Sequence, residues 1–329
     1  MLVSYSADSG RSCGTDFSYY MRGGVGSRRA TGPHVLGHES SGIVYAVGLE
    51  VTNVRPGDRV ALEPALPCYT CRYCRDGQFK WVVTIPGRDS WQLLCPRRIL
   101  CHSAYWSVRT VSFNPADSID GTLCQWFKCP AVNAVRLPEK ITWPEAGCIQ
   151  PLAIAVQIAR RARTLTHKVV AVFGCGPLGL LCCAVARAYG ARHVIAFDIS
   201  APRVEFAKKY AAQSGFVTAS PPPEADVMTW NDSKAATYLR ELNEPAIDVI
   251  LECSGAESAM QLGISLLRPG GTCEYKLNSY WGGVVDLPSS RGSRHGQAHD
   301  FVPVSRAVGK GARSPRFSPV HDGLFRGRY

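Results

Sequence analysis

Apolar side chains begin to recur at a regular interval near residue 145, where EAGCIQPLAIAVQIARRA places them at helical spacing. Beyond this point, continuous apolar runs alternate with segments of helical period. The runs predict strands that are buried on both faces, over residues 169–173, 193–197 and 247–255. The periodic segments predict helices over residues 178–189 and 257–271, the second stopped by Pro269, Gly270 and Gly271. This alternation predicts an α/β fold with a doubly wound parallel sheet, and after Gly271 the pattern dissolves.

The part of the chain before residue 145 has a different pattern. Residues 36–62 mix isolated Val and Ile with Gly and contain a turn at Pro56-Gly57-Asp58. Such a mixture predicts short strands of a β-rich, barrel-like domain. Residues 81–119 contain three Trp but follow neither the strand nor the helix period. A long stretch without periodicity is not typical of a compact domain, so we expect this segment to be atypical.

Composition narrows the class of protein. A length of 329 residues favours two domains, and 46% hydrophobic with 19% charged residues is typical of a globular chain. No apolar run reaches the roughly 18 residues of a membrane-spanning helix, and no secretory signal is recognisable, so we expect a cytoplasmic protein without membrane contact. The 14 Cys could form a disulfide framework, but without a signal peptide reduced thiols and a metal site are favoured.

The net charge of +11 raises the question of nucleic-acid binding. Residues 288–329 contain eight Lys or Arg and two Asp, so 8 − 2 = +6 of this excess lies in a segment rich in Gly, Ser and Pro. A basic tail of low complexity is usually a solvated, disordered segment. Nucleic-acid contact through this tail is the minor alternative.

A glycine-rich turn joins the predicted strand 169–173 to the following helix. Gly174, Gly176 and Gly179 have the G-x-G-x-x-G spacing. The first glycine allows a tight turn, the second lets the backbone approach a pyrophosphate, and the third lets the helix pack on the strand. Pro177 and Leu178 begin the helix, whose free N–H groups and dipole favour phosphates. The sequence predicts a dinucleotide site; the alternative is that the glycines serve packing alone.

Asp198 ends the second predicted strand, 19 residues after Gly179 (198 − 179). A carboxylate in this place accepts hydrogen bonds from both ribose hydroxyls and repels a 2′-phosphate, which favours NAD over NADP. Alternatively, Asp198 is an ordinary loop acid. Arg203 could lie against the adenine or could be an ordinary cation on the helix surface.

Three residues near the N-terminus have side chains that bind zinc. Cys13 precedes Gly14-Thr15-Asp16, and His38 and Glu39 stand in the string Gly37-His38-Glu39-x-x-Gly42-x5-Gly48. Three such ligands with one open position are typical of a catalytic zinc site. A lone His or Glu would more often be structural, but the glycine-framed string is far more specific.

At these residues the chain resembles the zinc-dependent medium-chain alcohol dehydrogenases, and within them the polyol branch of sorbitol and xylitol dehydrogenases. The resemblance covers residues 12–80 and 120–273 and rests on SCGTD, GHESSGIVYAVG, VRPGDRVALEP, DGTL, QPLAIAV, GCGPLG, FDIS and IDVILECSGAESAMQLGI. It implies a GroES-like catalytic domain over residues 1–155, with 81–119 as an insertion. A Rossmann domain over 156–275 and a basic tail over 276–329 would follow.

The resemblance also implies roles for single residues. Cys13 and His38 would bind the catalytic zinc, with Glu39 as third ligand or close support. Thr15 would relay the alcohol proton and Tyr19 would line the substrate pocket. Zinc would act as a Lewis acid, and the secondary alcohol of a polyol would pass a hydride to NAD, giving a ketose.

The family often adds a structural zinc held by four cysteines with the spacing C-x2-C-x2-C-x7-C. Cys68, Cys71 and Cys74 match it, but the fourth place is Val82. Cys95, in Leu94-Cys95-Pro96, resembles the missing ligand displaced by 13 residues (95 − 82). It could close the site if the intervening residues loop out. Otherwise the three cysteines are reactive thiols.

Several departures from the family keep other functions open. Gln150 stands where the family has a glutamate that ligates zinc or orients its water, and Ser18 stands where it has a histidine. The chain matches neither the full N-terminal strands nor the C-terminal segment that carries an Arg-Tyr pair for the polyol. It is therefore either a zinc polyol dehydrogenase, a catalytically impaired relic that binds NAD or zinc, or a partner-binding protein acting through its tail. The family is often tetrameric, but the resemblance leaves open both whether this chain forms a homo-oligomer and which polyol it uses.

Overall fold

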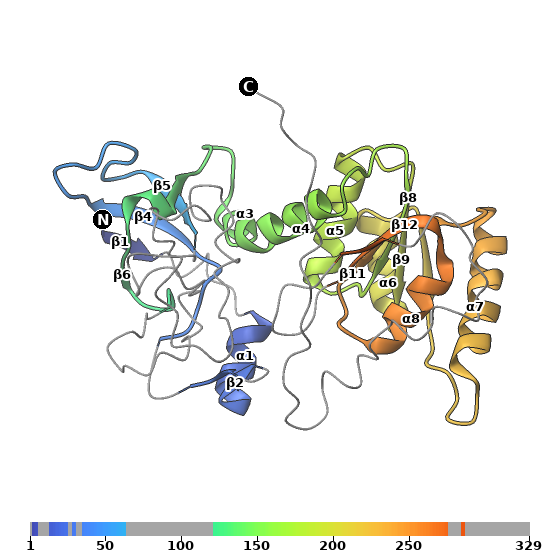
Figure 1. Ribbon diagram of the computed structural model, residues 1–329. Helices are drawn as coiled ribbons and strands as arrows, with labels where there is room; N and C mark the ends of the chain where they lie inside the picture. Colours follow the sequence, from blue (N-terminus) through green and yellow to red (C-terminus); the bar gives the residue numbers. More distant parts are fainter. Residues whose placement is uncertain are drawn as a thin grey trace, which may run out of the picture.

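The computed structural model describes residues 2–5, 13–25, 28–30, 35–63, 121–275 and 284–286. These residues form a β-rich part, which contains the N-terminus, and an α/β part (Figure 1). Helix α4 (Ile149–Arg161) lies between the two and packs mainly on α5 of the α/β part. Two sheets joined by one helix agree with the predicted combination of a GroES-like and a Rossmann domain.

The β-rich part is built on an antiparallel sheet with the strand order β6-β1-β4-β5-β7. Its strands are short and have these bounds: β1 Leu2–Tyr5, β4 Ser41–Ala46, β5 Arg59–Leu62, β6 Trp126–Lys128 and β7 Ala134–Arg136. The family resemblance implies strands before Cys13, and one such strand is present as β1. A small core of Val44, Val54, Val60, Leu62 and Phe127 fills the sheet's inner face.

Shorter elements complete this part. The helix α1 (Gly14–Arg22) is followed by the strand pair β2 (Gly24–Val25) and β3 (Arg28–Arg29). A 3₁₀ turn (Ala131–Asn133) precedes β7, and the short helix α3 (Trp143–Ala146) leads into α4.

The α/β part contains a six-stranded sheet with the order β10-β9-β8-β11-β12-β13. Its strands are β8 Val169–Phe173, β9 His193–Asp198, β10 Ser214–Val217, β11 Ile247–Glu252, β12 Leu267–Tyr275 and β13 Val284–Asp286. The first five are mutually parallel, whereas β13 pairs antiparallel with β12. The predicted doubly wound parallel sheet is confirmed, and β8 occupies the predicted residues.

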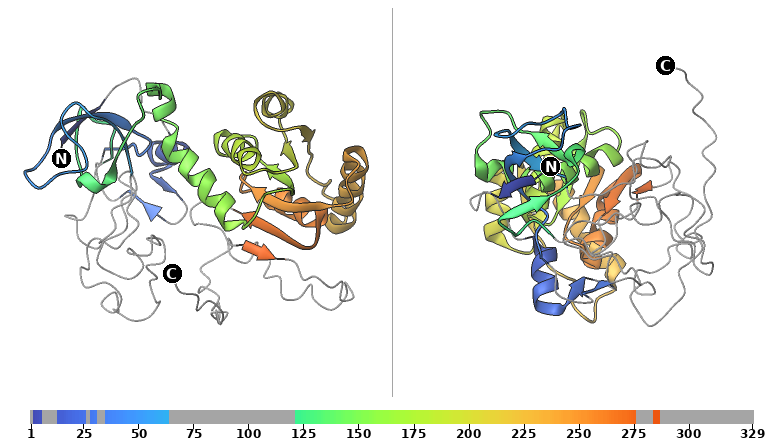
Figure 2. Two further views of the ribbon diagram at one scale, coloured as in Figure 1. Left: turned by 90° about the horizontal axis from the view of Figure 1, so that it is seen from above. Right: turned by 90° about the vertical axis from the view of Figure 1, so that its left-hand side faces the viewer.

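Helices cover both faces of this sheet (Figure 2). On one face α4, α5 (Pro177–Ala188) and α6 (Ala201–Tyr210) share a core with Val170, Val172 and Leu251 of the strands. On the other face α7 (Val227–Leu242) and α8 (Glu257–Leu266) cover Phe173, Phe197 and their neighbours. Successive strand residues point to opposite faces, which explains why the apolar runs are continuous.

The prediction of a helix over residues 257–271, with no further pattern after Gly271, was wrong in two respects. The helix ends at Leu266 and not at Gly271, and the pattern continues as β12. Pro disfavours helical backbone in the residue before it, so Pro269 keeps Arg268 out of the helix. Leu267 pairs with Ile247 and the next partners are Thr272 and Val249, so residues 268–271 form a bulge before the regular ladder. Strand residues 272–275 are too few to show a period in the sequence.

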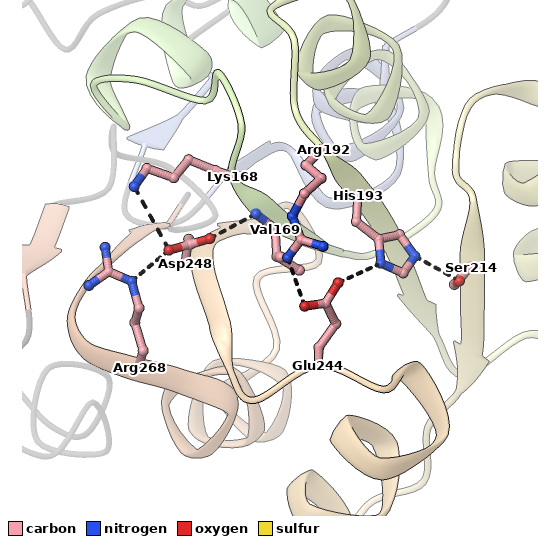
Figure 3. A network of polar contacts seen from close by, with 8 residues as sticks. All are labelled: Lys168, Val169, Arg192, His193, Ser214, Glu244, Asp248 and Arg268. Carbon is pink, nitrogen blue, oxygen red and sulfur yellow. Dashed lines mark hydrogen bonds and ion pairs between the residues drawn. The ribbon is translucent and has the colours of Figure 1, made fainter.

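Polar contacts join the amino-terminal ends of the parallel strands, at the edge opposite the glycine-rich turn (Figure 3). Asp248 accepts a hydrogen bond from the Val169 N–H (2.9 Å) and from Arg268 Nε (2.6 Å), with Lys168 Nζ 3.9 Å away. Glu244 similarly pairs with Arg192 at 2.8 Å and with His193 at 3.2 Å. These contacts connect neighbouring strands outside the apolar core.

The predicted domain boundary after residue 155 falls within α4 and stays a prediction. The segment 81–119 and, apart from β13, the basic tail 276–329 lie outside the described residues. Within the described residues, no helix is both long and apolar enough to span a membrane.

Candidate metal and coenzyme sites

A short ladder of backbone hydrogen bonds positions His38. Residues 35–37 pair with residues 121–123: Gly121 N–H donates to Val35 O, Thr122 N–H to Gly37 O and Leu123 N–H to Leu36 O, at 2.7 to 2.9 Å. Gly37 has φ +99°, and a Cβ built there would lie 2.5 Å from Leu123 Cγ. Only glycine fits this close approach, because it tolerates positive φ and has no side chain. Residues 121–123 therefore hold the backbone of residues 35–37, directly before His38.

Cys13 occupies the N-cap of α1, with extended backbone. Asp16, three residues later, accepts a hydrogen bond from the Cys13 N–H at 3.1 Å, as the acidic residue of a capping box does. Its other oxygen accepts the Gly37 N–H at 3.1 Å and lies 3.4 Å from His38 Nδ1. Asp16 thereby joins the start of α1 to the His38 segment, 21 residues away in sequence.

The ligand atoms of Cys13, His38 and Glu39 all lie within 4.8 Å of one another. His38 is buried, and the other two are half-buried. A thiolate, an imidazole and a carboxylate form a donor set suited to zinc, and three protein ligands leave the fourth position of a tetrahedral zinc ion to water or substrate. Because Nδ1 of His38 faces Asp16, Nε2 is left for the metal. The residues present therefore fit a zinc ion.

Asp16 is a further residue of the metal site, beyond those predicted from the sequence. It is 3% exposed, and the signal that could have identified it is its place three residues after Cys13. Burial raises the pKa of its carboxyl, but the contacts with His38, Gly37 and Cys13 outweigh this and hold that pKa below its usual value. Burial also opposes charge on His38, yet hydrogen bonds with Asp16 and Cys13 raise the pKa of His38 to about 10. A bound metal would replace this proton.

The other predicted catalytic residues lie on two helices. Thr15 and Tyr19 are on α1; Thr15 is half-buried and Tyr19 is 4% exposed. Gln150 lies in the first turn of α4, and its buried Oε1 has no hydrogen-bond partner among the described residues. A buried acceptor without a donor is unusual, and a ligand or ordered water would satisfy it. Ser18, in the place of a family histidine, donates from its hydroxyl to Gly14 O at 2.9 Å.

The glycine-rich turn has the geometry of a phosphate-binding loop. Gly174 has φ +90°, and its N–H donates to Phe197 O at 2.7 Å. A Cβ built on Gly179 would lie 1.7 Å from Gly174 O, so the third glycine is needed for helix packing. Around Gly176, by contrast, no described atom lies within 4 Å of an added Cβ. This space is open for a phosphate group, which is the role expected of the second glycine.

The start of α5 supplies the donors for such a phosphate. Gly176 is the N-cap and Pro177 is the first helical residue, where its missing N–H is not needed. The N–H groups of Leu178 and Gly179 follow in the first turn, where helices have unpaired donors and a positive dipole end. The loop therefore fits the pyrophosphate of a dinucleotide.

Asp198 is held beside this loop at the end of β9. One carboxylate oxygen accepts the Cys175 N–H at 2.6 Å and the other accepts the Ser200 N–H at 2.8 Å. Each oxygen keeps a lone pair for a ribose hydroxyl, so the side chain is oriented for NAD. Arg203 is exposed on α6. Burial, followed by the charges of Asp198 and Cys253, raises the pKa of the Cys175 thiol to about 12. The positive charge of Arg203 opposes this rise. Cys68, Cys71, Cys74 and Cys95 lie outside the described residues.

Two family models match the chain. Residues 7–139 match the alcohol dehydrogenase GroES-like domain, and residues 177–275 match the zinc-binding dehydrogenase model. The two matches correspond to the β-rich part and to the α/β part from α5 to β12.

The chain is also similar to curated proteins and solved structures. It is 40% identical over 262 residues to a probable D-xylulose reductase A of Aspergillus clavatus, covering 79% of this chain and 63% of the relative. It is 39% identical over 261 residues to the corresponding protein of Aspergillus terreus, covering 79% and 64%. Galactitol-1-phosphate dehydrogenase from Escherichia coli superposes with a TM-score of 0.65 at 25% identity, covering 84% of this chain and 67% of that structure.

The chain thus spans less than two thirds of the length of these curated relatives. Zinc and NAD are the cofactors that its two sites fit. The resemblance in the sequence is confirmed: the chain belongs to the zinc-dependent medium-chain alcohol dehydrogenase family.

Proposed function

We propose that the chain is an NAD-dependent zinc polyol dehydrogenase, which interconverts a polyol such as xylitol or sorbitol with the corresponding ketose. The observation that carries the proposal is the convergence of Cys13, His38 and Glu39 within 4.8 Å in a chain that also contains a phosphate-binding loop. The relatives named D-xylulose reductase support the polyol as substrate class.

Each cofactor would have its own set of residues. Cys13, His38 and Glu39 would hold the zinc, and Asp16 would fix the orientation of the His38 ring. The N–H groups that follow Gly176 would hold the pyrophosphate, and Asp198 would hold the ribose. When bound, zinc supplies a Lewis acid that acidifies the alcohol, and NAD supplies the hydride acceptor.

Three further side chains would act on the substrate. The hydroxyl of Thr15, two residues after Cys13, would accept and pass on the alcohol proton. Tyr19, one turn further along α1, would exclude water from the pocket because it is almost fully buried. The unpaired Oε1 of Gln150 would accept a hydrogen bond from a hydroxyl or from water at the zinc.

The first experiment measures zinc per folded chain by elemental analysis, together with NAD-dependent oxidation of xylitol, sorbitol and arabinitol. We expect Cys13→Ser to lose one zinc and all turnover. Cys148→Ser is the matched control, because this half-buried thiol donates to the Pro144 carbonyl at 3.6 Å and is not one of the three candidate zinc ligands. A second zinc, retained in Cys13→Ser, would mean that the four-cysteine site is also filled. Absence of zinc from the soluble parent chain would overturn the proposal.

The second candidate is a relic of a polyol dehydrogenase that binds zinc or NAD without turnover. Gln150 favours it, since an amide supplies neither the charge nor the proton acceptance of the family's glutamate. Gln150→Glu distinguishes the two. For an impaired enzyme we expect turnover to rise by roughly tenfold, the lower end of the effect of a residue that supports a metal ligand, with unchanged NAD affinity. An active parent whose turnover does not rise would show that Gln150 does not limit the reaction.

The chain is further proposed to act in the cytoplasm as a homo-oligomer. All described cysteines are reduced thiols, which is typical of a reducing compartment. Light scattering of the purified chain tests the oligomeric state, and a monomeric mass would overturn it.

A further inference from the structure

Two thiols outside both proposed sites are in contact beside the phosphate-binding loop. Cys182 Sγ and Cys253 Sγ are 3.6 Å apart, and the two residues are 71 positions apart in the sequence. Cys182 lies on α5 and Cys253 directly follows β11. Both are reduced. The fold therefore brings together a pair of cysteines that no motif connects.

The two thiols differ in access to solvent. Cys253 is half-buried, whereas Cys182 is fully buried at 0% exposure. A small oxidant can reach Cys253, and the thiol of Cys182 is then in place to react with the oxidised sulfur. Nearby Cys175 and Cys183 are also buried, and burial first of all raises the pKa of both thiols. Cys182 is distinguished from them by its 3.6 Å contact with the accessible sulfur of Cys253.

We propose that Cys182 and Cys253 are an oxidative modification site, which forms a disulfide with peroxide and thereby weakens dinucleotide binding. In the first step the sulfur of Cys253 attacks hydrogen peroxide, giving a sulfenic acid and one water. In the second step Cys182 attacks that sulfur, the S–S bond forms, and the hydroxyl leaves as a second water. The two electrons and both thiol protons end in the two waters, so the oxidation balances.

The bond would change the geometry of the loop. A disulfide has an S–S length of about 2.0 Å, so the two sulfurs must approach by about 1.6 Å from their present 3.6 Å. Cys253 N–H donates to Phe173 O at 2.8 Å, and Ser254 N would lie 2.8 Å from a Cβ on Gly174. The Cys253 turn thus packs directly on the glycine turn, and α5 carries the phosphate donors. A shift of either element displaces donors that must converge on the pyrophosphate.

This inference rests on the proposed coenzyme site. The test treats the full chain with hydrogen peroxide, identifies the cross-link by mass spectrometry, and measures NADH binding by fluorescence before and after oxidation. We expect tryptic peptide 169–187 to become linked to peptide 241–276. We also expect NADH to bind about tenfold more weakly to the oxidised chain, as displacement of a preorganised site by about an ångström implies. By linkage, saturating NADH should slow the cross-link.

Variants separate this pair from the other thiols. Cys253→Ser and Cys182→Ala should each abolish both the cross-link and the loss of NADH affinity, while Cys183→Ala, the adjacent residue on α5, should retain both. Lack of a cross-link in the parent, its persistence in Cys253→Ser, or equal NADH affinity of the reduced and oxidised chains would overturn the inference. If the reduced chain binds no NADH, both the proposed function and the predicted loss of NADH affinity fail. The masses of the cross-linked peptides then show by themselves whether Cys182 and Cys253 form a disulfide.

Discussion

The two candidate sites differ in how the chain assembles them. The coenzyme site is local: Gly174, Gly176, Gly179 and Asp198 lie within 25 consecutive residues (198 − 174 + 1), on two adjacent parallel strands and the helix between them. The metal site joins three separated segments, residues 13–16, 37–39 and 121–123. The first depends on backbone conformation within one motif, and the second on contacts made only in the folded chain.

The packing around the two sites also differs. The six-stranded sheet is covered on both faces by apolar cores, and strand β8 is completely buried. Among its described residues the β-rich part has one small core, and the segments of the metal site are joined by Asp16 and by backbone hydrogen bonds. Because polar contacts of this kind require all partners to be in place, the metal site should be the more sensitive of the two to loss of a single side chain.

The largest effect is expected for a glycine of the local site. In Gly179→Ala the added methyl group would lie 1.7 Å from the Gly174 carbonyl, so the helix must move away from the turn. We expect the free energy of unfolding to fall by about 3 kcal/mol, as for a strongly overpacked position. Urea denaturation of the purified variant measures this change.

Gly176→Ala is the matched variant, since no described atom opposes its methyl group. We expect unchanged stability with NADH affinity at least about tenfold lower, because the methyl group occupies the space of a phosphate. Equal loss of stability in both variants would show that the glycines serve packing alone.

A smaller but specific effect is expected at the metal site. Asp16→Ala removes the contacts with His38, Gly37 and Cys13. We expect the Cys13-dependent zinc to dissociate about 10 to 100 times more readily, the usual result of removing a residue that orients a metal ligand. Competition with a chromogenic chelator measures this change.

Asp226→Ala is the control for this variant, because Asp226 caps α7 by accepting the Thr229 N–H at 2.9 Å, far from the metal site in sequence. It should lose a similar helix cap, worth about 1 kcal/mol, without any change in zinc retention. Zinc retention in Asp16→Ala equal to that in Asp226→Ala would contradict the positioning role.

The smallest effect concerns the strand ends in Figure 3. Burial raises the pKa of Asp248, but its hydrogen bond from Val169 and its cationic partners outweigh this and hold that pKa below the usual 3.8. The ionised carboxylate therefore stabilises the folded chain fully above the unfolded-state pKa, and this contribution is lost as the pH falls through the lower folded-state value. Asp248→Asn should reduce stability by about 1 kcal/mol at neutral pH.

The difference between the parent and Asp248→Asn should disappear in strong acid, which unfolding curves at a series of pH values can follow. Glu224→Gln, an exposed acid in the loop before α7, is the control and should change little at any pH. A difference that persists unchanged at low pH would show that the effect of Asp248 is steric and not electrostatic.

The amino-acid sequence alone predicts the α/β part and identifies most of the candidate site residues. The strand 169–173, the turn with its three glycines and the position of Asp198 follow from residues next to one another, whose backbone preferences and apolar period act locally. Cys13, His38 and Glu39 could also be named, because zinc selects a small set of side chains.

Contacts between residues that are distant in the sequence are known only from the folded chain. Asp16 became a supporting residue of the metal site because the Gly37 backbone and the His38 ring pack against it. The end of α8 at Leu266 and the bulge before β12 follow from pairing with β11. The contact between Cys182 and Cys253 arises because α5 lies on the carboxyl end of β11. Such contacts have no local pattern, since they depend on packing between segments that are separated along the chain.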